Sequence, residues 1–177
     1  MFTGGLYCLI GCPRSGKSTI AEGWLNHKYD IFNWKIIKGT PKIYDGKLCR
    51  LQSAPRIVVC ADKIRIALHG QRFAGEAEQF VHAIKNMIIR MYLDQGYSIL
   101  VDGTHTTKSS LKELLLLDKN LQCAIIDTDK GVCEDRAREC GQTDLITEGV
   151  IDRMYNQLTL WKNNPQKFIQ EILEELK

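Results

Sequence analysis

One eight-residue segment, from Gly11 to Ser18, limits the folds open to this chain more than any other feature of its sequence. It reads Gly-Cys-Pro-Arg-Ser-Gly-Lys-Ser and fits the pattern G-x-x-x-x-G-K-[ST] at every defined position. The apolar run 6–10 precedes it, and a helical pattern from Gly16 to about His27 follows. A glycine-rich turn between a buried strand and a helix directs backbone N–H groups and the helix N-terminus at a phosphate group. The segment therefore predicts a phosphate-binding loop at the start of an α/β domain.

The residue types in this loop predict a role for each position. We expect Lys17 to reach the β- and γ-phosphates of ATP and to act in catalysis, and the Ser18 hydroxyl to bind Mg²⁺. The whole set expected to hold the phosphate donor is Gly11, Cys12, Pro13, Arg14, Ser15, Gly16, Lys17, Ser18 and Thr19. The sequence contains no N-K-x-D guanine motif, and a single acid, Asp102, ends the apolar run 98–101. These features favour a small kinase over a GTPase or a mechanical ATPase.

Other apolar runs and helical patterns alternate along the chain. Strands are predicted at 57–60, 98–101 and 123–126, each buried, and helices at 75–95, 108–117, 131–140, 148–161 and 165–176. In the first of these helices, an apolar face is predicted from the spacing of Phe80, Ile84, Met87, Ile88 and Met91. This alternation predicts an α/β fold of the P-loop kinase type, with three layers and a mostly parallel sheet covered by helices on both faces. We expect a single domain over residues 1–177.

Composition excludes several classes of protein. The chain is 44% hydrophobic and 25% charged, which excludes a disordered, collagen-like or coiled-coil chain. A net charge of +3 permits a polyanionic partner without requiring one. Seven cysteines without a C-x-x-C pair are typical of reduced, buried thiols, and no apolar run approaches the roughly 18 residues of a membrane span. We therefore expect a cytoplasmic protein with no membrane partner, whose oligomeric state the sequence leaves open.

Residues 34–56 interrupt the alternation and are strongly basic. The segment holds six basic residues against one acid, and Asp45-Gly46 is typical of a tight hairpin turn. We interpret it as a basic hairpin inserted at the edge of the sheet. Two functions remain open at this point: a path for nucleic acid, with Trp34 and Tyr44 available to stack on bases, or a solvated surface insertion.

A second pair of residues predicts where the acceptor of the phosphoryl group binds. Asp62 directly follows the strand 57–60 and its alanine, at the end of the sheet where α/β folds bind ligands, and Arg65 comes three residues later. A carboxylate can accept the proton of an acceptor hydroxyl, and a guanidinium can hold a substrate phosphate. Asp62 also fits the N-cap of the following helix, and the two roles are compatible.

At these residues the chain resembles the 5′-hydroxyl polynucleotide kinases that heal the ends of DNA or RNA. The resemblance runs from about residue 6 to 157 and rests on three motifs in this order: Gly11-Cys12-Pro13…Gly16-Lys17-Ser18-Thr19, Ala61-Asp62-Lys63-Ile64-Arg65 and Val101-Asp102-Gly103-Thr104-His105. It implies that Asp62 is the general base, that Arg65 holds the phosphate 3′ of the acceptor nucleoside, and that Asp102 orients either the arginine or the metal shell. ATP, Mg²⁺ and nucleic-acid 5′-hydroxyl ends are the ligands it implies.

The resemblance also implies an arginine-bearing lid over the γ-phosphate, which we place at residues 131–147. Arg136 matches the family pattern and is expected to bind ATP and act in catalysis. The family's second lid arginine falls on Cys140, so we include Arg138 among the expected cofactor-binding residues as a possible substitute. Arg14 is a further departure, since the family commonly has glycine there, and it is either a second source of positive charge or a solvated loop residue.

The sequence therefore leaves three functions open. The leading one is ATP-dependent phosphoryl transfer to a nucleic-acid 5′-hydroxyl. The second is a kinase of a small molecule such as a nucleoside, a sugar or a nucleotide-sugar, because D-x-x-R is not exclusive to polynucleotide substrates. The third is a weakly active nucleotide-binding regulator, favoured by the missing arginine at Cys140.

Overall fold

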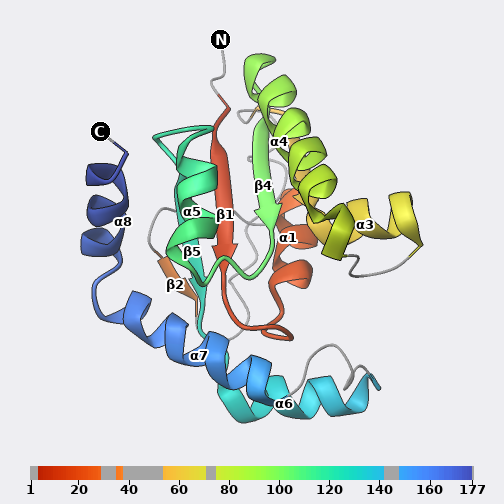
Figure 1. Ribbon diagram of the computed structural model, residues 1–177, viewed down its shortest axis with the longest axis vertical. Coiled ribbons are helices and arrows are strands. Elements are labelled where there is room, and N and C mark those ends of the chain that lie inside the picture. Colours follow the sequence, from red (N-terminus) through yellow and green to blue (C-terminus); the bar gives the residue numbers. More distant parts are fainter. Residues whose placement is uncertain (1–3, 29–34, 38–53, 71–74, 142–147, 177) are drawn as a thin grey trace.

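The computed structural model describes residues 4–28, 35–37, 54–70, 75–141 and 148–176. Within these ranges five strands form one parallel sheet in the order β2-β5-β1-β4-β3 (Figure 1). The strands are β1 (Leu6–Ile10), β2 (Lys35–Ile37), β3 (Arg56–Cys60), β4 (Ser98–Asp102) and β5 (Gln122–Ile126). Helices separate them along the chain, so the predicted three-layer α/β fold is confirmed. None of the helices in the described ranges is long and apolar enough to cross a membrane.

Alternate side chains of the central strands enter two separate cores. On one face Leu9, Leu100 and Ala124 pack with Trp24 of α1 (Lys17–Leu25). On the other face the neighbouring strand residues pack against the remaining helices. Those helices include α4 (Glu78–Asp94), α5 (Lys108–Leu115), α7 (Glu148–Asn163) and α8 (Pro165–Glu174). Burial on both faces is why these strands read as continuous apolar runs.

Parallel pairing brings the carboxyl ends of the strands to one end of the sheet. In Figure 1 β1 and β4 both point toward that end, and α6 (Lys130–Glu139) and α7 lie across it. The phosphate loop leaves β1 there, and the short helix α3 (Ala61–His69) starts there directly after β3. The sheet therefore places the candidate site residues of the described chain near the carboxyl ends of its strands.

Two sequence-based expectations about burial are wrong. The strand β3 was expected to be buried, but it is the edge strand of the sheet and only Val59 is fully covered. In α4 the predicted apolar face is largely exposed: Phe80 is 70% accessible, and Met87 and Met91 are each 54% accessible. The helix instead buries a different row of side chains: Val81, Lys85 and Ile89. A lysine therefore lies on the inner face of α4, held there by an ion pair described below.

The two described ends of the basic segment 34–56 belong to the parallel sheet. Lys35–Ile37 forms a parallel edge strand beside β5, so the segment does begin at the sheet's edge. Arg56 belongs to β3, where it donates a hydrogen bond to the Trp24 carbonyl at 2.8 Å and stacks over the Trp24 ring. The expected turn at Asp45-Gly46, with Trp34 and Tyr44, lies outside the described residues.

Candidate active site

The phosphate loop has the backbone that its sequence predicts. Gly16 adopts a φ of 94°, a left-handed conformation that favours glycine, and directly precedes the first residue of α1. Gly11 donates a backbone hydrogen bond to the Thr104 carbonyl at 3.0 Å, which ties the loop to the segment after β4. The Thr128 hydroxyl donates to the Ser15 carbonyl at 2.8 Å. The loop is therefore held from two neighbouring strands before any ligand binds.

Lys17 lies inside the loop that its motif forms. Its ammonium donates to the Cys12 carbonyl at 2.5 Å and approaches the Ser15 hydroxyl at 3.4 Å, and the residue is only 7% exposed. Burial lowers the pKa of Lys17, while the carboxylates of Asp102 and Asp62 act in the opposite direction. A cation enclosed by backbone N–H groups at a helix N-terminus is suited to bind phosphate anions.

Ser18 and Asp102 meet at the centre of the site. The Ser18 hydroxyl donates to the Asp102 carboxylate at 2.8 Å, although the two residues come from α1 and the end of β4. Hydroxyl and carboxylate oxygens beside bound phosphates are the ligands that Mg²⁺ prefers, so these side chains fit the metal expected at Ser18. Of the two roles left open for Asp102, this contact supports the metal shell.

The lid helix contacts the phosphate loop through one of its two candidate arginines. Arg136 donates from its guanidinium to the Arg14 carbonyl at 3.1 Å and lies 3.9 Å from the position that a Cβ on Gly16 would take. Arg138 instead pairs with Asp135 on the exposed surface of α6, at 2.5 Å. Arg136 therefore lies beside the phosphate loop, whereas the ion pair of Arg138 is with a neighbour on its own helix. Residues 142–147 of the expected lid lie outside the described residues.

Asp62 and Arg65 form an ion pair in the first turn of α3, as their spacing predicts. The Asp62 side chain is 71% exposed and so is open to a substrate. Arg65 is mostly covered, and it also binds Glu78 of α4 in a bidentate manner, with both nitrogen–oxygen distances at 2.6 Å. The hydrogen bond to Glu78 is the main reason that the pKa of Arg65 is raised. Glu78 therefore holds the guanidinium of Arg65 in place.

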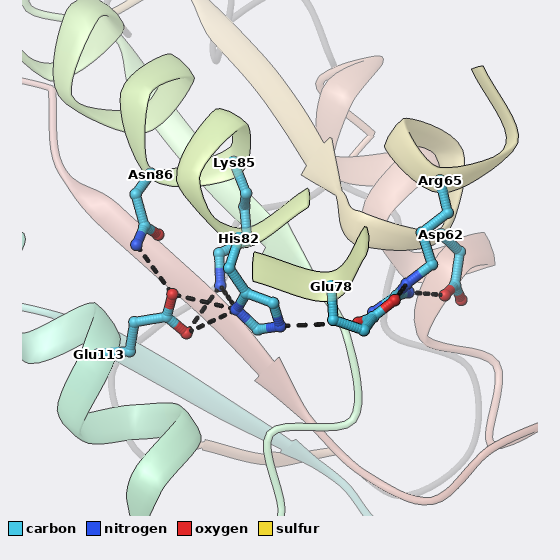
Figure 2. A network of polar contacts seen from close by, with 7 residues as sticks. All are labelled: Asp62, Arg65, Glu78, His82, Lys85, Asn86 and Glu113. Atoms are coloured by element: carbon cyan, nitrogen blue, oxygen red, sulfur yellow. Dashed lines mark hydrogen bonds and ion pairs between the residues drawn. The ribbon is translucent and has the colours of Figure 1, made fainter. Parts of the chain in front are cut away.

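A cluster of polar side chains continues from Glu78 into the molecule (Figure 2). His82 lies 3.9 Å from Glu78 and 3.1 Å from Glu113 of α5. Lys85, only 3% exposed, donates to Glu113 at 2.9 Å, and Asn86 donates to the same carboxylate at 2.8 Å. Burial opposes ionisation of Glu113, but the hydrogen bonds from Lys85 and Asn86 prevail and lower its pKa. Lys85 therefore keeps a charged partner in the interior.

Three members of this cluster, His82, Lys85 and Glu113, form one wall of a cavity of about 310 Å³ beside the phosphate loop. The cavity is also bounded by Asp62, Arg65, Asp102 and the segment 103–105. Its volume is near the lower end of the range typical of small-ligand sites. Of the predicted residues, the structure brings Asp62, Arg65 and Asp102 together here, and it places Lys17, Ser18 and Arg136 at the adjoining phosphate loop.

Sequence reasoning missed five residues near this cavity: Glu78, His82, Lys85, His105 and Glu113. No role was predicted for the charged positions of the helices at 75–95 and 108–117. Lys85 did carry a signal, because it lies four residues from both Val81 and Ile89 and so shares their face of the helix. The partner of Lys85 on α5 had no comparable signal in the sequence.

No family model matches this chain, and no curated protein matches it. Its fold is similar to that of a chain in the Pnkp1/Rnl/Hen1 RNA repair complex, with a TM-score of 0.67 and 18% identity over 92% of this chain. It is also similar to APE1195, with a TM-score of 0.56 and 15% identity over 84% of this chain and 76% of that one. This chain spans 46% of the length of the RNA repair chain. At these identities the likenesses establish a shared fold.

Proposed function

We propose that this protein transfers the γ-phosphoryl group of ATP to the 5′-hydroxyl end of a nucleic acid, DNA or RNA. The observation that carries the proposal is the position of the Asp62–Arg65 pair. It lines a cavity that is also bounded by Asp102, whose carboxylate accepts a hydrogen bond from Ser18 of the phosphate loop. The Asp102 carboxylate would thus lie between the bound ATP and the acceptor hydroxyl. The D-x-x-R motif and the fold shared with a chain of an RNA repair complex support a nucleic-acid acceptor.

The proposed reaction follows from the chemistry of these side chains. The Asp62 carboxylate accepts the proton of the acceptor hydroxyl, whose oxygen bonds to the γ-phosphorus while the bond from that phosphorus to the β,γ-bridging oxygen breaks and ADP leaves. Lys17 and Arg136 place positive charge beside the oxygens on which negative charge develops. Mg²⁺ bound at Ser18 and Asp102 would add charge neutralisation of the phosphates. Glu78 keeps Arg65 beside the base.

A second candidate function has its own support in the charge of the cavity. Two cations reach the cavity, and each is already paired: Arg65 with Glu78 and Asp62, and Lys85 with Glu113. A cavity of about 310 Å³ with this balance offers little free positive charge for a phosphate next to the acceptor hydroxyl. An uncharged small acceptor, such as a nucleoside or a sugar, would fit this feature.

A panel of acceptors separates the two candidates. We would measure transfer of labelled γ-phosphate from ATP, with Mg²⁺ present, to 5′-hydroxyl DNA and RNA oligonucleotides, a free nucleoside, a nucleoside 3′-monophosphate, simple sugars and a water blank. Preferential labelling of the oligonucleotides supports the polynucleotide kinase. Preferential labelling of the free nucleoside or a sugar supports the small-molecule kinase. Bound ATP with no labelled acceptor would count against both.

A further inference from the structure

His105 has an unusual conformation in the turn that follows β4. Its backbone φ is 45°, in the left-handed region that non-glycine residues rarely adopt. The turn is anchored on both sides of it: the Thr104 carbonyl accepts from Gly11 at 3.0 Å, and the Thr106 hydroxyl donates to Gln157 of α7 at 2.8 Å. The surrounding structure therefore holds His105 in an unfavourable conformation, as is common at binding sites.

The imidazole of His105 is also unsatisfied. Both ring nitrogens are buried, and neither has a hydrogen-bond partner within the described part of the chain. The ring lies against its own turn, since a Cβ on Gly103 would sit 2.7 Å from the His105 Nε2 atom. A buried polar group without a partner is costly, and native proteins rarely keep one without a functional reason.

The surroundings of the ring define what it can bind. Burial is the main reason that the pKa of His105 falls to about 3, and the nearby cations Lys85 and Lys17 lower it further, against the opposing charge of Glu113. The ring is therefore neutral near pH 7, with one nitrogen that donates and one that accepts. A ring with one donor and one acceptor suits a group that can itself both donate and accept a hydrogen bond. It does not suit a phosphate anion, which only accepts.

The neighbouring side chains at the cavity have already used much of their bonding capacity. Lys85 and Glu113 bond each other, and the Ser110 hydroxyl donates to the Thr107 carbonyl at 2.8 Å. His105 lines the same cavity with both ring nitrogens uncommitted.

We propose that His105 is a specificity-determining residue of the acceptor site, whose ring hydrogen-bonds a neutral donor–acceptor group of the terminal nucleoside, either a sugar hydroxyl or a base edge. This inference rests on the proposed function insofar as the cavity receives the acceptor. It extends that function by assigning recognition of the nucleoside to this side of the cavity and proton transfer to Asp62.

Equilibrium binding tests the inference without requiring turnover. The probe is a 5′-hydroxyl trinucleotide, labelled at its 3′ end and titrated by fluorescence anisotropy in the presence of a non-hydrolysable ATP analogue. We expect His105→Phe to raise the Kd about tenfold, the effect of one hydrogen bond to an uncharged partner. His105→Gln, which keeps a donor and an acceptor, should recover part of the loss. His27→Phe is the matched control, because His27 also has a positive φ but lies beyond α1 and does not line the cavity.

Two further arms identify the group that is bound. If a base edge is the partner, a trinucleotide with an abasic 5′-terminal sugar binds wild type and His105→Phe equally. If a ribose hydroxyl is the partner, wild type and His105→Phe bind the trinucleotide with a 5′-terminal 2′-deoxy sugar equally. Equal Kd values for His105→Phe and wild type with the intact trinucleotide would overturn the inference, as would a wild type that binds no trinucleotide. Wild type that binds the probe in a His105-dependent way but transfers no phosphate would contradict the proposed function alone.

Discussion

At the scale of single residues, the Ser18–Asp102 hydrogen bond joins two positions 84 residues apart in the sequence. Because the serine supplies the oxygen expected to bind Mg²⁺, Ser18→Ala should raise the Mg²⁺ concentration needed for half-maximal phosphoryl transfer by about tenfold. The measurement is the transfer rate across a Mg²⁺ titration. Ser109→Ala, an exposed hydroxyl on α5, is the control and should leave the titration unchanged. An unshifted titration for Ser18→Ala would remove Ser18 from the metal site.

His105 also predicts a dependence of stability on pH. Its pKa is about 3 in the folded protein, against an ordinary value of 6.5, so between these values the unfolded chain binds one more proton. Stability should therefore fall as the pH falls through this window, by up to about 1.4 kcal/mol per pH unit for this one group. Urea unfolding at pH 6.5 and 5.0 should show a larger loss for wild type than for His105→Gln. Equal losses would mean that the ring is not held neutral.

The Lys85–Glu113 pair gives a second prediction about stability. Glu113→Gln would leave the buried Lys85 ammonium without its anionic partner, at a cost of about 2 to 3 kcal/mol, somewhat less than for a fully buried pair because Glu113 is partly exposed. Adding Lys85→Met should restore part of this loss, since the unpaired charge is then gone. The free energy of unfolding by urea tests both variants. A double variant less stable than Glu113→Gln would contradict the claim that the unpaired Lys85 charge causes the loss.

At the scale of elements, α6 brings Arg136 to the phosphate loop, although Cys140 stands where a second lid arginine was expected. Since Arg136 alone of the two arginines has a described contact with the loop, Arg136→Ala should lower the rate of transfer about 100-fold. Arg138→Ala should cause a much smaller loss, because its guanidinium pairs with Asp135. The rate at saturating ATP compares them, and equal losses would show that Arg138 substitutes for the missing arginine.

The sequence predicted the elements better than it predicted their exposure. The predicted strands and helices lie where the structure has them because apolar runs and phosphate-loop chemistry are local signals, although the short strand β2 was not predicted. The exposure of β3 and the outward face of α4 depended on which strand lies at the edge of the sheet, which is a property of the assembled fold. The donor side of the site was predictable because the phosphate loop is a run of consecutive residues. The cavity wall made by His82, Lys85 and Glu113 was not, since it needs α4 and α5 side by side.

At the scale of the whole molecule, the site exists because parallel strands end together. β1 delivers the phosphate loop, β3 delivers Asp62 and Arg65 at the start of α3, and β4 ends at Asp102 between them. The order β1-β4-β3 puts the end of β4, with Asp102, between the phosphate loop after β1 and the Asp62–Arg65 pair after β3. Asp62 is therefore the residue on which the account as a whole depends.

The most direct test is transfer of labelled γ-phosphate to a 5′-hydroxyl oligonucleotide by wild type, Asp62→Asn and Asp94→Asn, with ATP affinity measured in parallel. Asp94 is the matched control, an exposed aspartate at the last residue of α4 that does not line the cavity. We predict that Asp62→Asn lowers transfer about 100-fold or more while ATP affinity and the Asp94→Asn rate stay near those of wild type. Undiminished transfer by Asp62→Asn, or no labelling of the oligonucleotide by wild type, would contradict the account.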